Sequence, residues 1–293
     1  MASRAASLAL PESAQSRLRF DRAAPSFASA CFVHDEARRR LLERLQHLRV
    51  ASGVIVDAGT ALGRGAAALG TLYPESRIIA LDTSREMLKR LPAGPAFRLQ
   101  GDVRQLPLPS GSVDLLLANL VLPWVLPEAL FAEARRVLRP DGLLLFATVG
   151  PDTLIELRRA WLAADDAVHV HAFWDAQTLG DLVVRAGLEE PVLDVDRLSI
   201  SYTELSHVIR DLRASGATNT AAGRRPGLTG RGRWQRFAEA LWRERGRGGE
   251  GRLNLSVELI FGQAFGSRRG VGRAGAEVVV PVERIGRKRG DAG

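Results

Sequence analysis

The stretch VIVDAGTALGRGAAAL, from Val54 to Leu69, decides the fold class. Its apolar beginning, which ends in Asp57, has the composition of a buried strand, and its alanine-rich end has that of a helix. The turn between them contains Gly59, Gly63 and Gly65. Such a turn brings backbone amides and a helix N-terminus to the edge of a sheet, where a nucleotide can bind. A glycine-rich turn by itself is weak support, because ordinary loops also contain glycine.

Short apolar runs and helical stretches alternate from this point to about residue 150. Strands are expected at 53–59, 76–82, 97–102, 113–120 and 142–149, and helices at 61–73, 83–91 and 126–138. Strict alternation of strand and helix predicts a parallel sheet that is covered by helices on both faces. Right-handed crossovers make such a sheet doubly wound, and its ligands bind at the carboxyl ends of the strands.

The flanking segments extend the same domain. After residue 150 we expect helices at 151–167 and 178–188, strands at 191–202 and 253–265, and a mostly helical, lid-like insertion at about 203–245. The run 276–285 is a weaker edge-strand candidate because it contains Pro281. Before the first strand, a loop from residue 20 leads into an amphipathic helix from about Asp35. The predicted fold class is α/β, with a Rossmann-like, doubly wound, seven-stranded, mostly parallel sheet and a helical lid insertion.

The composition is that of a globular protein with a basic surface. At 293 residues the chain can form one large domain or a domain with an appendage, and no segment approaches the roughly 18 apolar residues of a membrane span. The single cysteine, Cys31, excludes an intramolecular disulfide and suits the cytoplasm. The net charge of +8 is almost entirely arginine, which forms either solvated loops or a surface for an acidic partner. The Ser- and Arg-rich start leaves a mitochondrial presequence open as an alternative.

Polar residues follow the strands at the edge where a ligand is expected. Asp82 ends the second strand about 20 residues beyond the glycines, which is the spacing at which an acid binds ribose hydroxyls. It could instead cap the helix that begins at Thr83. Asp102 ends the third strand, where an acid could meet an adenine amino group, and Asn119 lies at the tip of the fourth. The turn lacks the G-x-G-x-x-G of a dinucleotide site, so another nucleotide is expected.

These motifs together resemble the class I S-adenosylmethionine-dependent methyltransferases. The resemblance rests on hydrophobic-D-x-G-x-x-x-G, the acid after the second strand, GD followed by LP, S-x-D-L-L and L-R-P-D-G-L-L-L-F, and it covers roughly residues 50–150. Further matches over about residues 20–265, of which GATNTAAGR is the most particular, resemble the malonyl-[acyl-carrier protein] O-methyltransferases of biotin synthesis. The layout is also similar to the methyltransferase-like assembly factors of respiratory complex I, which are mitochondrial arginine hydroxylases. The quoted residues do not separate these two families.

The resemblance implies a cofactor, a substrate and the residues that bind them. The cofactor is S-adenosylmethionine, held by Asp57, Gly59, Gly63, Asp82, Asp102 and Asn119. The methyl acceptor is the free carboxylate of malonyl-acyl carrier protein, an acidic partner, and this carboxylate is already ionised at neutral pH, so no general base is needed. A cation should hold it. Arg213 and Arg224 in the insertion are the catalytic candidates, because a guanidinium fork fits a carboxylate.

The chain departs from the family pattern at four positions. Ala61 replaces a glycine in the pattern D-A-G-C-G-T-G, and Phe27 replaces a tyrosine near the mouth of the active site. Ala118 and Pro123 replace polar residues that are expected beside the cofactor. A positive backbone angle at residue 61 would add strain of roughly 1–2 kcal/mol. These departures leave a non-catalytic, diverged homologue as an alternative.

The remaining expectations concern domain organisation and other ligands. The resemblance divides the chain into an N-terminal segment over the active site (1–34), a methyltransferase domain (35–265) and a basic C-terminal tail (266–293). No metal is expected, because His169 and His171 lack a third ligand at a supporting spacing. A nucleic acid partner is not expected, since the arginine–glycine tail lacks interleaved aromatic residues. A membrane partner is not expected either, since no apolar run is long enough to span a bilayer. The five tryptophans are spread along the chain and are expected in the core or in a pocket wall.

Overall fold

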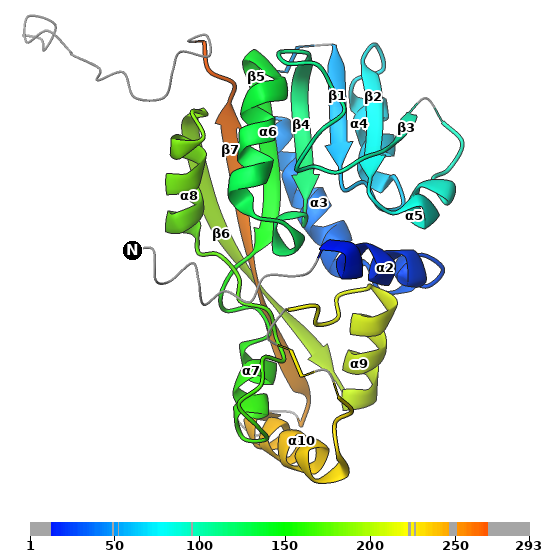
Figure 1. Cartoon of the computed structure of the whole chain (residues 1–293), viewed down its shortest axis with the longest axis vertical. Helices are drawn as coiled ribbons and strands as arrows, with labels where there is room; N and C mark the ends of the chain where they lie inside the picture. Colours follow the sequence, from blue (N-terminus) through cyan, green and yellow to red (C-terminus); the bar gives the residue numbers. More distant parts are fainter. Residues whose placement is uncertain are drawn as a thin grey trace, which may run out of the picture.

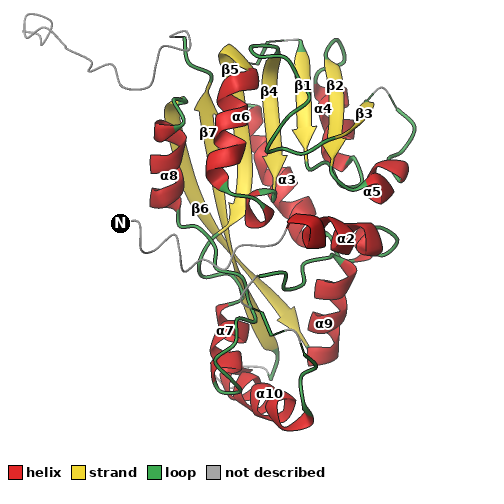
Figure 2. Cartoon of the chain, viewed as in Figure 1, coloured by secondary structure: helices red, strands yellow, loops and turns green. Residues whose placement is uncertain are grey.

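Seven strands form one sheet in the order β3-β2-β1-β4-β5-β7-β6 (Figures 1 and 2). The computed structural model describes residues 13–48, 50–51, 53–94, 96–221, 224–225, 227–245 and 251–268. The strands are β1 (Val54–Ala58), β2 (Arg77–Asp82), β3 (Phe97–Gln100), β4 (Val113–Asn119), β5 (Leu138–Val149), β6 (Glu189–Tyr202) and β7 (Leu253–Phe265). β1 to β5 pair in parallel, and β7 is antiparallel to both β5 and β6. The predicted seven-stranded, mostly parallel sheet is confirmed.

Helices cover both faces of this sheet (Figure 2). They are α2 (Ser13–Ala23), α3 (Phe32–Leu45), α4 (Arg64–Leu72), α5 (Arg85–Lys89), α6 (Pro127–Val137), α7 (Ile155–Leu162), α8 (Ala176–Arg185), α9 (Leu205–Ala214) and α10 (Arg231–Arg245), with short 3-10 helices η1 (Phe27–Ser29) and η2 (Leu122–Trp124). Local sequence fixes several of their starts. Ser84 and Asp175 cap α5 and α8 by accepting a backbone N–H, and Pro127 occupies the first turn of α6.

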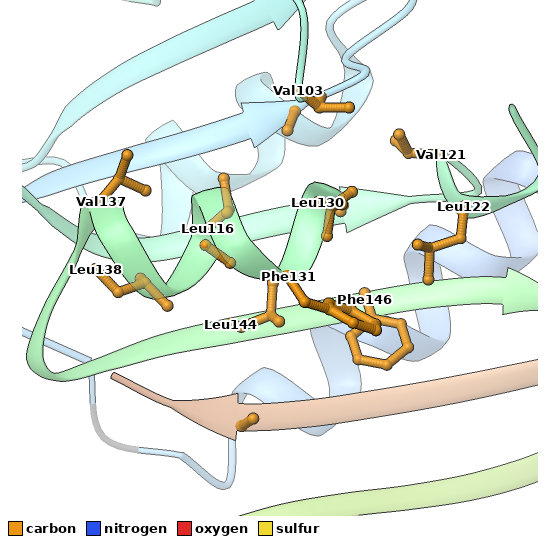
Figure 3. Packing of buried hydrophobic residues seen from close by; sticks show 14 of the residues in the cluster. Val103, Leu116, Val121, Leu122, Leu130, Phe131, Val137, Leu138, Leu144 and Phe146 are labelled. Atoms are coloured by element: carbon orange, nitrogen blue, oxygen red, sulfur yellow. The ribbon is translucent and has the colours of Figure 1, made fainter. Parts of the chain in front are cut away.

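Two apolar cores sandwich the sheet, because successive residues of β4 point to opposite faces. Leu116 faces α6 and α8, where it packs in a cluster that contains Phe131 and Phe146 (Figure 3). Leu115 faces α3 and α4 in a second cluster. Each fully buried leucine or phenylalanine contributes about 1.5–3 kcal/mol of burial free energy. The continuous apolar run of β4 is therefore explained by burial on both sides.

β6 and β7 continue past the end of β5 and support a separate lobe (Figure 1). α7, α9 and α10 pack around the extended part of this ribbon, with their own apolar cluster centred on Phe237 and Leu241. α2 lies between this lobe and the carboxyl ends of the central strands (Figure 1). Arg19 of α2 donates to Thr218 in the loop after α9 (2.8 Å), and Ser26, which follows α2, donates to the carbonyl of Ala214 at the end of α9 (3.1 Å).

Three local expectations need correction or fall outside the described residues. The expected loop from residue 20 is wrong, since α2 continues to Ala23 and α3 begins at Phe32. The helix expected at 61–73 begins only at Arg64, because Gly63 adopts a left-handed conformation before it. The edge-strand candidate at 276–285 lies outside the described residues. No described helix combines the length and the apolar composition that crossing a bilayer requires.

Candidate functional site

A cavity of about 440 Å³ lies at the carboxyl ends of β1 to β4, and we call it the strand-tip cavity. Because these strands are parallel, their carboxyl ends meet at one edge although they are far apart in the sequence. α2 contributes Phe20 to the wall, and η2 contributes Trp124. The predicted cofactor residues that line the cavity are Gly59, Asp82, Asp102 and Asn119.

Hydrogen bonds tie the turn after β1 to two acids. Thr60 donates its hydroxyl to Asp57 (2.6 Å), and the backbone N–H of Ala61 donates to Asp82 (2.9 Å). The N-cap of α5 is Ser84, not Asp82, although Asp82 accepts the Ser84 backbone N–H (2.8 Å). The Asp82 carboxylate therefore orders both the glycine turn and the start of α5, and it also lines the strand-tip cavity.

Burial makes both of these acids harder to ionise. It raises the pKa of Asp57 from 3.8 to about 6, against the opposing effect of the hydrogen bond from Thr60. Burial likewise raises the pKa of Asp82. When both acids are ionised, the turn holds two buried carboxylates, which make the region electronegative. A cationic ligand fits such a region better than an anionic one.

The raised pKa of Asp57 predicts a defined pH dependence of stability. A carboxyl group whose pKa is higher in the folded state stabilises the fold at low pH, and this contribution is lost as the pH rises from about 4 to about 6. The free energy of unfolding of Asp57→Asn, relative to the wild type, should therefore rise by about 3 kcal/mol across this window. Urea unfolding at a series of pH values measures it. A constant difference between the two proteins would contradict the raised pKa.

The glycines of the turn are required mainly by packing. Gly59 has φ +70°, and a Cβ there would lie 2.5 Å from a methyl carbon of Val121. Gly63 has φ +74°, and its Cβ would lie 2.6 Å from Leu91 Cγ. Gly63 is not among the residues that line the cavity. The absence of a side chain at residue 63 therefore makes room for Leu91, and the assignment of Gly63 to cofactor binding stays a prediction.

Asp102 at the tip of β3 and Asn119 at the tip of β4 differ in how freely they can bind a ligand. Arg104 forms a bidentate pair with Asp102 (2.5 Å from Nη2 to Oδ2), which lowers the pKa of that carboxyl, so a ligand would share the acid with Arg104. Asn119 donates its amide N–H to the His34 carbonyl (3.0 Å), while its Oδ1 is buried without a partner. Buried polar atoms are normally hydrogen-bonded, so this oxygen fits the N–H of a ligand.

Ala61 adopts φ +47°, which is the positive backbone angle that adds strain to a non-glycine residue. Its methyl group packs against an apolar cluster that contains Phe27 and Met87. Ala61 also lines the strand-tip cavity and a narrow side pocket of about 40 Å³ next to it, while the main cavity persists at about 440 Å³. Alanine in place of glycine at residue 61 therefore narrows the strand-tip cavity where it adjoins the side pocket, and it does not close the cavity.

Replacing Ala61 with glycine should relieve the strain and widen that end. We expect Ala61→Gly to stabilise the fold by up to about 1 kcal/mol, because the left-handed angle costs glycine nothing, partly offset by the greater freedom of glycine in the unfolded chain. Chemical denaturation measures this. The control Ala67→Gly, on the exposed face of α4, should destabilise by about 1 kcal/mol. Equal destabilisation by both changes would show that residue 61 is not strained.

The other departures from the family pattern lie in different places. Phe27 lines the strand-tip cavity, with its ring 5.0 Å from that of His34. The expectation that Ala118 lies beside the cofactor is wrong, because its side chain is 1% exposed in the core between the sheet and α6. Pro123 lines a second cavity instead of the strand-tip cavity. The changes therefore do not converge on one pocket.

The second cavity has a volume of about 320 Å³ and extends into the lobe; we call it the lobe cavity. Its wall is mainly apolar and includes Leu157, Val208 and Leu255. Arg213 is among the lining residues and is exposed to solvent. Arg224 is not among the lining residues, and it donates to the Ala221 carbonyl (3.1 Å). The structure brings Arg213 to a cavity and leaves the role of Arg224 a prediction.

Three residues of the site were not singled out as ligands from the sequence. His34 and Trp124 line both large cavities, and Arg38 lines the side pocket together with Asp57. Burial lowers the pKa of His34 to about 4, so its ring is neutral at pH 7. The signal in the sequence was weak, because His34 and Arg38 lie one turn apart on α3, which has the pattern of an ordinary amphipathic helix.

The two histidines considered as metal ligands have other partners. His169 contacts Asp165 (2.7 Å) and stacks on Trp161. His171 accepts the backbone N–H of Thr220 (2.9 Å). Within the described part of the chain, no group of three or more histidines, cysteines and acids is placed to hold a metal ion.

Comparison with known proteins assigns this arrangement to a class and a family. The chain matches the methyltransferase-domain family over residues 56–146. The YcgJ protein of Bacillus subtilis has the same fold, with a TM-score of 0.56 and 17% identity over 79% of this chain and 99% of that one. The fold and the site define a class I S-adenosylmethionine-dependent methyltransferase.

Two curated relatives specify the family. A malonyl-[acyl-carrier protein] O-methyltransferase from Laribacter hongkongensis is 44% identical over 263 residues, which cover 85% of this chain and 88% of the relative. A protein of the same name from Methylovorus sp. is 40% identical over 87% of this chain and 90% of its own. The chain belongs to the malonyl-[acyl-carrier protein] O-methyltransferase family.

Proposed function

We propose that this protein methylates the free carboxylate of a malonyl group on acyl carrier protein, in the cytoplasm and as a step of biotin synthesis. The observation that supports this most is the meeting of two cavities. One lies at the strand tips and suits a cationic cofactor, and the other is mainly apolar and has the exposed Arg213 among its lining residues. The names of the relatives point to the same substrate.

S-adenosylmethionine, when bound, supplies an electrophilic methyl group on a positively charged sulfur. In the strand-tip cavity Asp82 would accept hydrogen bonds from the ribose hydroxyls, and Met87 and Val103 would offer apolar contacts to the adenine. The unpartnered Oδ1 of Asn119 would accept a hydrogen bond from the ammonium group of the methionine end. In the side pocket, Arg38 can hold the carboxylate of that end.

In the lobe cavity, Arg213 would hold the malonyl carboxylate beside a mainly apolar wall. The apolar wall removes water from the carboxylate, which strengthens its attraction to the positively charged sulfur. The bound cofactor would supply its methyl group to the acceptor oxygen, and the electron pair of the broken carbon–sulfur bond would stay on sulfur. No proton moves, so alignment and desolvation account for most of the rate enhancement.

The charge of the chain suits an acidic carrier. A protein with a net charge of +8 attracts an acidic partner over several ångströms, and such steering raises the association rate at low salt. Arg17 on α2 is exposed and lines the strand-tip cavity, and Arg213 is exposed at the lobe cavity. Both guanidinium groups can therefore act in docking as well as in binding.

Intact-mass measurement of the carrier protein tests this proposal. With S-adenosylmethionine and the full chain, malonyl-acyl carrier protein should gain the mass of one methyl ester. Acetyl-acyl carrier protein, which has no free carboxylate, should gain none. The absence of a methyl ester on the malonyl carrier, under conditions in which S-adenosylmethionine binds, would contradict the proposed acceptor.

The alternatives have less support. The curated relatives do not favour arginine hydroxylation or assembly of respiratory complex I. A non-catalytic homologue would require the methyl group of Ala61 to block the site, yet the strand-tip cavity remains open beside it.

A further inference from the structure

The strand-tip cavity and the lobe cavity meet at three side chains. Among the described residues, only His34, Leu120 and Trp124 line both cavities. A methyl group that passes from a donor in the first cavity to an acceptor in the second must cross this junction. The charge and shape of these three side chains therefore act directly on the sulfur, the methyl group and the acceptor oxygen.

Trp124 is held at the junction from both sides. Its ring lies edge-on to Phe20, which lines the strand-tip cavity, at 5.0 Å and 85° between the planes. It also lies edge-on to His171, which lines the lobe cavity, at 5.4 Å and 77°. Edge-to-face contacts of this kind are favourable and fix the orientation of the ring. The three rings therefore form a continuous aromatic wall from one cavity to the other.

None of the three shared side chains carries a positive charge at pH 7, so they do not repel a cation at the junction. His34, the one titratable side chain that both cavities share among the described residues, is neutral at pH 7 because burial disfavours its charged form. No lysine or arginine of the described part lines both cavities. A positively charged group at the junction therefore meets no fixed like charge from the shared residues, and it can contact the indole of Trp124, which lines both cavities.

We propose that Trp124 contacts the positively charged sulfur of the methyl donor and stabilises it by a cation–π interaction, so that this side chain contributes more to binding of the donor than to binding of the neutral product. This inference rests on the proposed methyl transfer. Transfer of the methyl group turns the sulfonium into a thioether and removes the positive charge. Trp124 then loses its electrostatic contact, which favours release of the product over retention.

Isothermal titration calorimetry with S-adenosylmethionine and S-adenosylhomocysteine tests the contact. We expect the ratio of the product Kd to the donor Kd to fall by about 2- to 30-fold in Trp124→Leu. This fall corresponds to the loss of a cation–π interaction of about 0.5–2 kcal/mol. In Trp124→Phe, whose ring attracts cations less strongly, the ratio should fall by roughly 2-fold. The control is Trp161→Leu, because Trp161 lines only the lobe cavity and stacks on Phe237. It should leave the ratio unchanged.

The outcomes separate this inference from the function on which it rests. A ratio that stays at the wild-type value in Trp124→Leu, while the donor still binds, overturns the contact. If the leucine variant does not fold, an unchanged ratio in Trp124→Phe overturns it. An equal fall in the Trp161 control also counts against it. Failure of the wild-type protein to bind S-adenosylmethionine would instead contradict the methyltransferase assignment.

Discussion

Replacing Asp82 with alanine is expected to weaken the binding of S-adenosylmethionine by about 30- to 1000-fold. A carboxylate that accepts two ribose hydroxyls contributes two charge-assisted hydrogen bonds, and their loss costs about 2–4 kcal/mol of binding free energy. The change also removes the acceptor for the Ala61 N–H, which loosens the glycine turn. Calorimetric titration of the cofactor measures the effect.

The control for Asp82→Ala is Asp181→Ala, which removes an exposed acid from α8. This variant should bind the cofactor as the wild type does, because Asp181 is not among the residues lining the strand-tip cavity. Asp82→Asn, which still accepts hydrogen bonds but carries no charge, should be intermediate. Wild-type affinity in the alanine variant would show that the ribose is bound elsewhere.

Arg213→Met should lower kcat/KM for malonyl-acyl carrier protein by about 10- to 100-fold and leave the affinity for S-adenosylmethionine unchanged. Arg213 lines the lobe cavity and not the strand-tip cavity, so the loss of its guanidinium should act on the acceptor alone. The magnitude corresponds to about 1.4–2.7 kcal/mol, at the lower end for a charged hydrogen-bonded pair because the group is exposed. Steady-state kinetics with the carrier protein as the varied substrate measures it.

A matched change on the same helix isolates this effect. Arg210 is 65% exposed, contacts Asp211 and is not among the lining residues of either cavity, so Arg210→Met should change kcat/KM by less than about 3-fold. Arg213→Lys should retain part of the activity, because it keeps the charge but loses the fork. Full activity of Arg213→Met would remove this residue from the mechanism and leave the carboxylate to another cation.

The sheet was predictable because its signals are local. A strand that is buried on both faces has a continuous apolar sequence, as in β4. The turn from β1 to α4 requires glycine residues with a positive φ angle. The acid at the end of β2 was found by its spacing, and the structure places it at the cavity. The pairing of β6 with β7 in the lobe could not be predicted, because the sequence pattern alone does not give the register of the two strands.

The less predictable part of the site depends on contacts that are distant in the chain. α2 has few apolar residues at helical spacing, and it is held in place by partners such as Thr218. His34 and Trp124 became recognisable as site residues only when the two cavities were seen to meet at them. For Arg224, residue type and position in the insertion suggested a role, but its hydrogen bond to Ala221 does not bring it to either cavity.

The direction in which the Ala118 side chain points could not be inferred from the family pattern. Its place in the family pattern suggested a neighbour of the cofactor. However, side chains alternate along β4, and this alternation sends Ala118 into the core and leaves Asn119 at the cavity. A shift of one residue along a strand changes the face completely, so proximity in sequence to a ligand residue does not imply contact.

A crystal structure of the protein with S-adenosylhomocysteine tests the central claim most directly. The account predicts that the ribose hydroxyls bind Asp82, that the sulfur lies at the junction beside Trp124, and that the amino-acid end passes Ala61 into the side pocket. Electron density for the ligand outside the strand-tip cavity, or a cavity closed by the Ala61 methyl group in a protein that does not bind the compound, would contradict it.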